Sequence, residues 1–290
     1  MTKPKVIFFE EDHSYYLLEN SKKTKLESVS SFYSKYKNSY NSGFWSAYKA
    51  YEKILPPGVF KDLKKTYGYD SPELLIVADM YVKDKEYFKT VQQQILNNWK
   101  KENKKSTDKG TEYHNTKETN AFINGAAINK YNLKCYNIGA EKLLDYNNYS
   151  IADNLYNLCE GFYPELLVFN EEALLAGQAD KVFITEFGGE KYVDIGDFKT
   201  NKKISKESFI GSSRKHTYLK PPLNHIMDSN YWHYALQLST YAFMLEKFGF
   251  RVRSLYLEHY DEIYFLPYLF NEIQNIYEIK LAINKLKRSS

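Results

Sequence analysis

The sequence predicts a mixed α/β (α+β) protein, and three observations lead to this class. First, residues 163–203 contain three apolar runs rich in β-branched and aromatic residues: Glu165–Phe169, Leu174–Thr185 and Lys191–Lys199. Second, turn residues separate the runs, and the pair Gly188-Gly189 between the last two is typical of a β-hairpin. Third, segments with helical periodicity flank the runs, so we expect an antiparallel meander of three strands packed against helices.

The first hundred residues are expected to add a hairpin and several helices. The N-terminal pattern predicts strands at Lys5–Glu10, Tyr15–Glu19 and Lys22–Leu26. A helix then starts at Ser28-Val29-Ser30-Ser31, where serine side chains can cap the free N–H groups. Helical patterns follow at Ser42–Leu55 and Phe60–Tyr67, from Ser71 onward, and at Glu86–Lys105. The run Pro56-Pro57-Gly58 ends the first of these helices.

Further elements surround the meander. The triplet Ser106-Thr107-Asp108 predicts the cap of a separate helix, Lys109–Phe122, which carries His114. Residues Ser150–Glu160 favour a helix that leads into the first core strand. The pattern then predicts a strong helix at Asn230–Phe248, a strand pair at Arg251–Tyr260 and Glu262–Pro267, and a C-terminal amphipathic helix at Leu269–Leu286.

These elements suggest two parts in a chain of 290 residues, a length that suits one large domain or a domain with a helical appendage. Residues 1–105 form a hairpin and helical region packed on the core, and residues 106–290 form the core. Within the core, residues 200–229 form a long basic loop, in which Lys202, Lys203, Arg214 and Lys215 interleave with Phe209 and Tyr218. Cations and aromatic rings suit the phosphates and bases of a nucleic acid, and a solvated, disordered insertion fits the loop equally well.

Bulk properties exclude several classes of protein. A net charge of +4 permits nucleic-acid binding without arguing for it. The two cysteines, Cys135 and Cys159, lack metal-ligand spacing, so we expect reduced thiols and neither a disulfide framework nor a four-cysteine iron–sulfur cluster. The sequence has no apolar run of membrane-spanning length and no signal-peptide pattern, so we expect a cytoplasmic protein (in the host cytoplasm if it is viral) without membrane contact.

Polar residues inside the predicted strands form the candidate site. Residues i and i+2 of a strand share a face, so Asp197 and Lys199 project in the same direction. A carboxylate and an ammonium at the rim of an apolar face are costly to bury unless they are paired or bound to a metal. Asp180 and Glu165 can point to the same region. Acidic oxygens around a lysine are suited to Mg²⁺ or Mn²⁺.

The same residues carry a family resemblance. Asp180 followed by Asp197-Phe198-Lys199 resembles the D…(D/E)-x-K signature of PD-(D/E)xK nucleases. The segment Gly110-Thr111-Glu112-Tyr113-His114 resembles the upstream histidine motif of the RecB-like, phage-type exonuclease branch. Gln237-Leu238-Ser239-Thr240-Tyr241 is similar to the Q-x-x-x-Y motif of that branch. The resemblance extends from about Gly110 to about Tyr260, and it implies a restriction-endonuclease-like αβββαβ core.

The resemblance also implies a role for each residue in a metal-dependent deoxyribonuclease. His114, Asp180, Asp197 and the Phe198 carbonyl would hold Mg²⁺ or Mn²⁺. Glu165 would complete this set or orient the attacking water, and Lys199 would stabilise the charge that develops during hydrolysis. Substrate binding would fall to Gln237, Tyr241, Lys202, Lys203, Arg214 and Lys215. A lone helical histidine is more often structural, and the motif match is what favours a ligand role for His114.

The expected activity is exonucleolytic hydrolysis of DNA in repair, recombination or viral replication. A structure-specific endonuclease is the alternative within enzymes, and a non-catalytic nucleic-acid-binding protein on the same fold is the alternative outside them. DNA is the expected partner, whether single- or double-stranded. The sequence leaves a homo-oligomer open.

Overall fold

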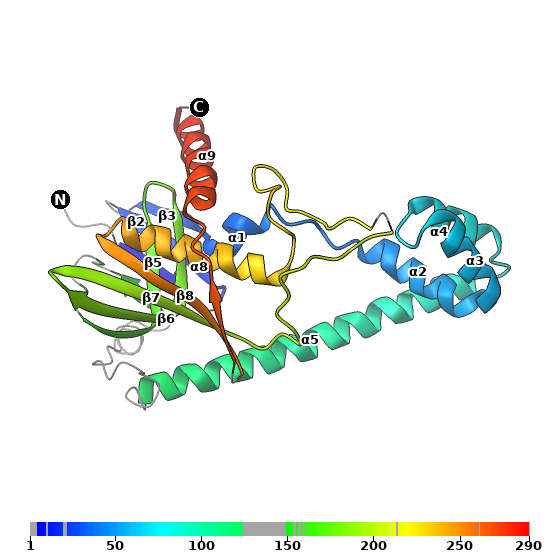
Figure 1. The fold of residues 1–290 in the computed structure, drawn as a ribbon, viewed down its shortest axis with the longest axis horizontal. Coiled ribbons are helices and arrows are strands. Elements are labelled where there is room, and N and C mark those ends of the chain that lie inside the picture. Colours follow the sequence, from blue (N-terminus) through cyan, green and yellow to red (C-terminus); the bar gives the residue numbers. More distant parts are fainter. Residues whose placement is uncertain are drawn as a thin grey trace.

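The computed structural model describes residues 5–9, 11–19, 22–123, 149–152, 155, 158, 160–212, 214–260 and 262–289. Over these residues the chain is an α+β protein with a mixed β-sheet, which confirms the predicted class. Figure 1 shows a sheet lobe and a helical lobe joined by one long helix, α5. Cys135 and Cys159, and with them the expectation about their thiols, lie outside the described residues.

The N-terminal strands belong to the sheet lobe. Strands β1 (Lys5–Phe9), β2 (Ser14–Glu19) and β3 (Lys22–Ser28) form an antiparallel meander, and β4 (Tyr149–Ala152) pairs antiparallel with β1. Strand β4 contradicts the helix that was expected to begin at Ser150, because pairing with the free edge of β1 decides the conformation of this segment. Helix α1 (Val29–Ser34) follows, and the Ser28 hydroxyl accepts the Ser31 N–H at 3.1 Å, which confirms the predicted cap.

The predicted central meander is confirmed. It consists of β5 (Gly161–Asn170), β6 (Leu175–Phe187) and β7 (Glu190–Lys199), with antiparallel pairing throughout. On the far side of β7, β8 (Phe250–His259) runs parallel to it, and β9 (Glu262–Leu266) runs antiparallel to β8. Residues Glu27 and Ser28 of β3 pair in parallel with the start of β6, so the N-terminal hairpin and the central strands form one continuous sheet.

Two helices complete the sheet lobe. Helix α8 (Asn230–Glu246) packs on the sheet through its apolar stripe, and the predicted core residues Ala235, Leu238, Ala242 and Leu245 are fully buried. Helix α9 (Phe270–Ser289) packs against α8 and contributes Ile273, Ile276 and Tyr277 to the same core. Among the described residues, no helix has both the length and the apolar character that a membrane span requires.

The helical lobe has a hydrophobic core of its own. It consists of α2 (Ser42–Ile54), α3 (Pro57–Tyr67), α4 (Pro72–Met80) and the first part of α5 (Lys85–Ile123). Its buried residues include Tyr51, Phe60, Leu74, Phe88 and Val91, and this cluster is separate from the core of the sheet lobe. The expected boundary at residue 105 lies inside α5, and β1–β3 and α1 contribute to the core of the sheet lobe.

The predicted break within α5 is wrong. Residues 106–108 do not cap a second helix, because the Thr107 hydroxyl donates to the Asn103 carbonyl at 3.0 Å and so is satisfied within a continuous helix. No proline interrupts the segment, and Gly110 in a helix interior costs only about 1 kcal/mol. The 39 residues of α5 therefore extend for about 58 Å at a rise of 1.5 Å per residue.

The loop at residues 200–229 has little regular structure and is nevertheless anchored at both lobes. The Lys220 N–H donates to the Tyr36 carbonyl at 2.7 Å, next to α1. The Ser212 N–H donates to an Asp70 carboxylate oxygen at 3.1 Å, and the Phe209 ring packs edge-on against Trp45. The described residues of this loop thus form a further connection between the lobes, in addition to α5 and the segment between α1 and α2, and they lie above α5 in Figure 1.

A glycine in β7 tests the packing that positions the candidate site. A Cβ at Gly196 would lie 2.4 Å from the buried Tyr256 ring, so Gly196→Ala must displace that ring. We expect this change to destabilise the protein by about 1–3 kcal/mol, measured by urea unfolding. Gly58→Ala is the control, since no atom lies within 4 Å of its added Cβ, and it should be neutral or slightly stabilising. Equal unfolding midpoints for Gly196→Ala and the wild type would contradict the packing argument.

Candidate metal centre

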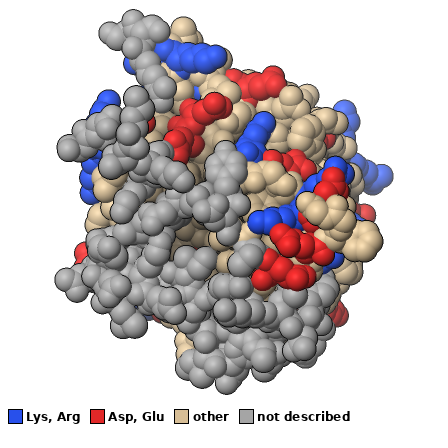
Figure 2. Space-filling view, turned by 90° about the vertical axis from the view of Figure 1, so that its left-hand side faces the viewer, with Lys and Arg blue, Asp and Glu red and all other residues tan. Residues whose placement is uncertain are grey.

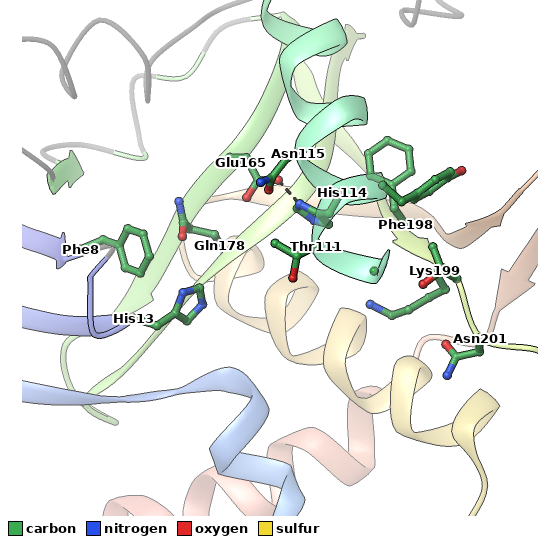
Figure 3. A pocket seen from close by; sticks show the side chains of 13 residues that line it. Phe8, His13, Thr111, His114, Asn115, Glu165, Gln178, Phe198, Lys199 and Asn201 are labelled. Atoms are coloured by element: carbon green, nitrogen blue, oxygen red, sulfur yellow. Dashed lines mark ion pairs between the residues drawn. The ribbon is translucent and has the colours of Figure 1, made fainter. Parts of the chain in front are cut away.

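A cleft of about 560 Å³ opens where the β1–β2 hairpin, α5 and the central strands meet. Figure 3 shows how side chains from these elements surround it. Phe8 and His13 come from the hairpin side, His114 and its neighbours from α5, and Glu165 and Gln178 from β5 and β6. Phe198 and Lys199 lie at the end of β7. The cleft therefore lies where α5 and the start of the loop at residues 200–229 reach the sheet.

Three potential metal ligands converge in this cleft. His114 Nε2 lies 2.9 Å from Asp180 Oδ2 and 3.7 Å from Glu165 Oε1. One ligand atom from each of the three residues lies within 4.8 Å of the other two. The side chains come from three different elements and are only 11–32% exposed. The fold thus gathers an imidazole nitrogen and two carboxylates that the sequence separates by up to 66 positions.

The register of β5 and β6 explains how the two acids meet. Pro164 pairs with Lys181 and Leu166 with Ala179, so Glu165 lies opposite Asp180. Directly opposite residues of an antiparallel pair share a face of the sheet. Glu165 has a φ of 50°, in the left-handed region that costs a non-glycine residue about 1–3 kcal/mol. Strain of this kind concentrates at functional sites, which supports a role for Glu165 beyond packing.

Asp197 and Lys199 lie beside this group, with the spacing that the sequence predicts. Their side chains form an ion pair, and the carboxylate of Asp197 is buried. Within the described part of the chain, Asp197 Oδ2 accepts no hydrogen bond of normal geometry, although it faces the Lys199 ammonium. The Phe198 N–H donates to Asp180 Oδ2 at 3.0 Å, which ties β7 to β6. Ligation by the Phe198 carbonyl stays a prediction.

The charges of these groups depend strongly on one another. The hydrogen bond to Asp180 raises the pKa of His114 to about 9, so the imidazole is protonated at neutral pH. Burial would raise the pKa of Asp180, but the bond and charge of His114 outweigh it and the pKa is lowered. Burial, with the charge of Asp180, raises the pKa of Asp197 to about 7. Burial opposes the charge of Lys199, yet the two aspartates keep its pKa above the ordinary value.

This donor set fits a divalent cation. In its absence, a proton on His114 and the ammonium of Lys199 balance the buried acids. A cation can replace that proton, and the carboxylate of Asp197, which is paired with Lys199, lies beside the site. Carboxylate oxygens suit Mg²⁺ and Mn²⁺, and the imidazole nitrogen shifts the preference toward Mn²⁺.

Sequence reasoning missed a network of charged residues that fixes α5 to the sheet. Glu258 of β8 accepts from Lys117 at 2.8 Å and from Lys181 at 2.5 Å. Lys117 lies one helical turn beyond His114, so this contact sets the position of the histidine. The two lysine nitrogens lie 5.5 Å and 4.6 Å from the centroid of the Phe198 ring. The available signal was the presence of Lys181 and Glu258 among the apolar residues of their strands.

The predicted substrate residues of α8 lie at two depths. Gln237 is half-buried, whereas Tyr241 is only 6% exposed. A Cβ at Gly177 would lie 2.8 Å from the Tyr241 ring, so the phenol packs directly under β6. Burial, with the nearby charges of Asp180 and Asp197, raises the pKa of Tyr241. Tyr241 thus lies beneath the carboxylates, and direct contact with a substrate stays a prediction for both residues.

The four predicted cations of the loop are all exposed and do not gather at the carboxylates. Lys202 lies against α5 near Trp99, outside the cleft. Lys203 follows it at the surface. Arg214 and Lys215 lie beyond Ser212, where the loop is bonded to Asp70 of the helical lobe. The structure therefore spreads these cations along the connection between the lobes.

The shifted pKa values make a prediction about cation binding. His114, with a pKa of about 9, must lose its proton to become a ligand, and the partly protonated Asp197 must also ionise. We therefore expect Mn²⁺ binding at pH 7 to release about one proton or more, and its affinity to rise with pH up to about 9. Calorimetric titration in buffers of different ionisation enthalpy measures this release.

His114→Ala serves as the control for that titration. The variant should bind Mn²⁺ more weakly and release fewer protons, because its largest proton donor is gone. Proton release equal to that of the wild type would remove His114 from the ligand set.

Comparison of the chain with protein-family models, with curated proteins and with solved structures finds no match. Conclusions about function therefore rest on the residues and their geometry.

Proposed function

We propose that this protein is a metal-dependent deoxyribonuclease that hydrolyses phosphodiester bonds, with a restriction-endonuclease-like core. The observation that carries the proposal is the convergence of His114, Glu165 and Asp180 within 4.8 Å, beside the ion pair of Lys199 with the buried Asp197. Structural ion-pair clusters do not need an imidazole, two carboxylates and a strained glutamate around one point. A cation site in a cleft accounts for all of them.

The order of elements supports the proposed core. Helix α5 precedes the meander β5–β7, and α8 leads into β8, which runs parallel to β7. This is the αβββαβ order that the motif resemblance implies. The motif residues His114, Asp180 and Asp197 to Lys199 lie on the expected helix and strands, and Gln237 and Tyr241 lie on α8.

In the proposed reaction, His114, Asp180 and Asp197 would hold one or two Mg²⁺ or Mn²⁺ ions, and Glu165 would complete this set or orient the attacking water. A divalent cation there supplies Lewis-acid chemistry, because it polarises a phosphoryl oxygen and makes water a competent nucleophile near neutral pH. Lys199 lines the cleft and stabilises the negative charge that develops on the phosphate. Glu165, which is 13% exposed at its side chain, orients the attacking water and accepts its proton. The leaving 3′ or 5′ oxygen takes up a proton from solvent.

DNA is the proposed partner, and exonucleolytic cleavage is the proposed mode. This mode rests on the His and Q-x-x-x-Y motifs of the RecB-like branch. The group of His114, Glu165 and Asp180 counts against a non-catalytic protein on the same fold, because such a protein has no need to retain two weakly exposed carboxylates around a histidine.

Removal of Lys199 tests the mechanism. Lys199→Met should lower the rate of Mn²⁺-dependent DNA cleavage by about 100-fold or more, as does the loss of other groups that stabilise a transition state. Asp197→Asn should do the same through the loss of a charged ligand. Lys191→Met, on the same strand but paired with Glu186, is the matched control and should cleave at the wild-type rate. A Lys199→Met protein that folds and cleaves normally would rule the mechanism out.

The mode of cleavage can be separated from the chemistry. With Mn²⁺ present, we expect linear DNA to be degraded from its ends while a covalently closed circle of the same sequence stays intact. Gel analysis over time measures both substrates. Nicking or linearisation of the closed circle would establish the endonuclease alternative in place of the exonuclease.

A further inference from the structure

The middle of α5 crosses between the lobes without packing on either of them. Ile95 still packs on the core of the helical lobe, and Gly110 is the first residue that lines the cleft of the sheet lobe. Residues 101–109 between them are all exposed. At 1.5 Å per residue, the distance from Ile95 to Gly110 is about 22 Å. A helix segment that is polar on all sides is typical of a bridge between domains, and its exposed side chains are accessible to a ligand.

A groove of about 620 Å³ lies beside this segment. Three parts of the chain line it: Tyr40 before α2, Trp99 and Lys100 on α5, and Lys202 at the start of the loop. The Tyr40 ring is 66% exposed and meets the Trp99 ring edge-on at 6.1 Å. The Trp99 ring is half-buried, and Lys100 and Lys202 line the same groove as the two rings, so an exposed aromatic face here has cations close to it.

The groove leads toward the metal centre. Ser106 lines the groove and Gly110 lines the cleft, and these residues are one helical turn apart on the same face of α5. Lys202 of the groove directly follows Asn201 of the cleft. The groove and the cleft thus adjoin along α5 and along the loop, at the place where Gly110 lies against Thr200. One extended ligand can occupy both.

The charge along this route favours a polyanion. The exposed part of α5 carries five lysines, at positions 100, 101, 104, 105 and 109, against Glu102 and Asp108. The loop beside it adds Lys202, Lys203 and Lys206 against Glu207. By contrast, basic and acidic side chains are interspersed over the described surface at the sheet end of the molecule (Figure 2). Lys100 and Lys202 line the groove itself, together with Glu102. The two chain segments that border the groove therefore carry an excess of cations.

We propose that this groove binds single-stranded DNA and directs it into the metal centre. One or two bases stack on Tyr40 and Trp99, and Lys100 and Lys202 contact the adjoining phosphates. An unpaired base presents its face to such rings, whereas the bases of a duplex remain stacked on one another. The inference deepens the proposed nuclease function by naming the form of the substrate.

Binding without divalent cations tests the groove apart from catalysis. In EDTA, fluorescence anisotropy with a labelled oligothymidylate should show affinities reduced roughly tenfold by Trp99→Ala and by Tyr40→Ala, the usual loss for one stacked base. The affinity for a blunt duplex of equal length should change little. Tyr87→Ala on the same helix, where the ring is 55% exposed but outside the groove, is the matched control and should bind as the wild type does.

The lysines make an independent prediction that does not depend on the aromatic variants. Lys100→Gln and Lys202→Gln should each reduce the slope of log affinity against log salt concentration by about 0.7, the value for one phosphate contact on a single strand. Lys61→Gln, on the exposed face of α3, should leave the slope unchanged.

The outcomes separate this inference from the nuclease proposal. Wild-type affinity in both aromatic variants would overturn the groove, and so would an equal loss of duplex and single-strand affinity. Asp197→Asn should keep full single-strand affinity in EDTA while it loses cleavage. If the groove variants lose affinity but no condition gives cleavage, single-strand binding is supported and the nuclease proposal fails alone.

Discussion

One carboxylate of low exposure, that of Asp180, determines the geometry of the site. Asp180 Oδ2 lies 2.9 Å from His114 on α5 and accepts the Phe198 N–H of β7 at 3.0 Å. Because Asp180 itself lies on β6, this single oxygen brings a helix and two strands to one point. A buried charge without such partners is costly, so the carboxylate stabilises the fold only when all three elements are in place. The contacts of Asp180 that join α5, β6 and β7 therefore also bring the candidate metal ligands together.

The sequence predicted the parts of the fold that local patterns specify. The meander β5–β7 and the α8 stripe follow from alternation and helical periodicity, and Asp197 and Lys199 share a face as the strand period requires. It failed where tertiary contacts override local signals. Residues 106–108 have good capping side chains, yet α5 continues through them, and Ser150 lies in a strand because the edge of β1 is available.

Long-range parts of the site could not be read from local patterns. The motif resemblance named His114, but only the docking of α5 through Lys117 and Glu258 explains why its imidazole reaches Asp180. The left-handed backbone at Glu165 and the burial of Tyr241 beneath β6 likewise depend on neighbours distant in sequence. The sequence predicted a basic loop at residues 200–229. The path of this loop depends on its contacts with Tyr36 and Asp70, which are distant in sequence.

The unbroken α5 has a mechanical consequence. A straight helix about 58 Å long behaves as a lever, with one end embedded in the helical lobe and the imidazole of His114 near the other. If the helical lobe tilted relative to the sheet lobe, α5 would carry that movement to the imidazole of His114. A ligand that favours one orientation of the helical lobe would then change the affinity of the site for the cation. By thermodynamic reciprocity, the cation would change the affinity for that ligand by the same factor.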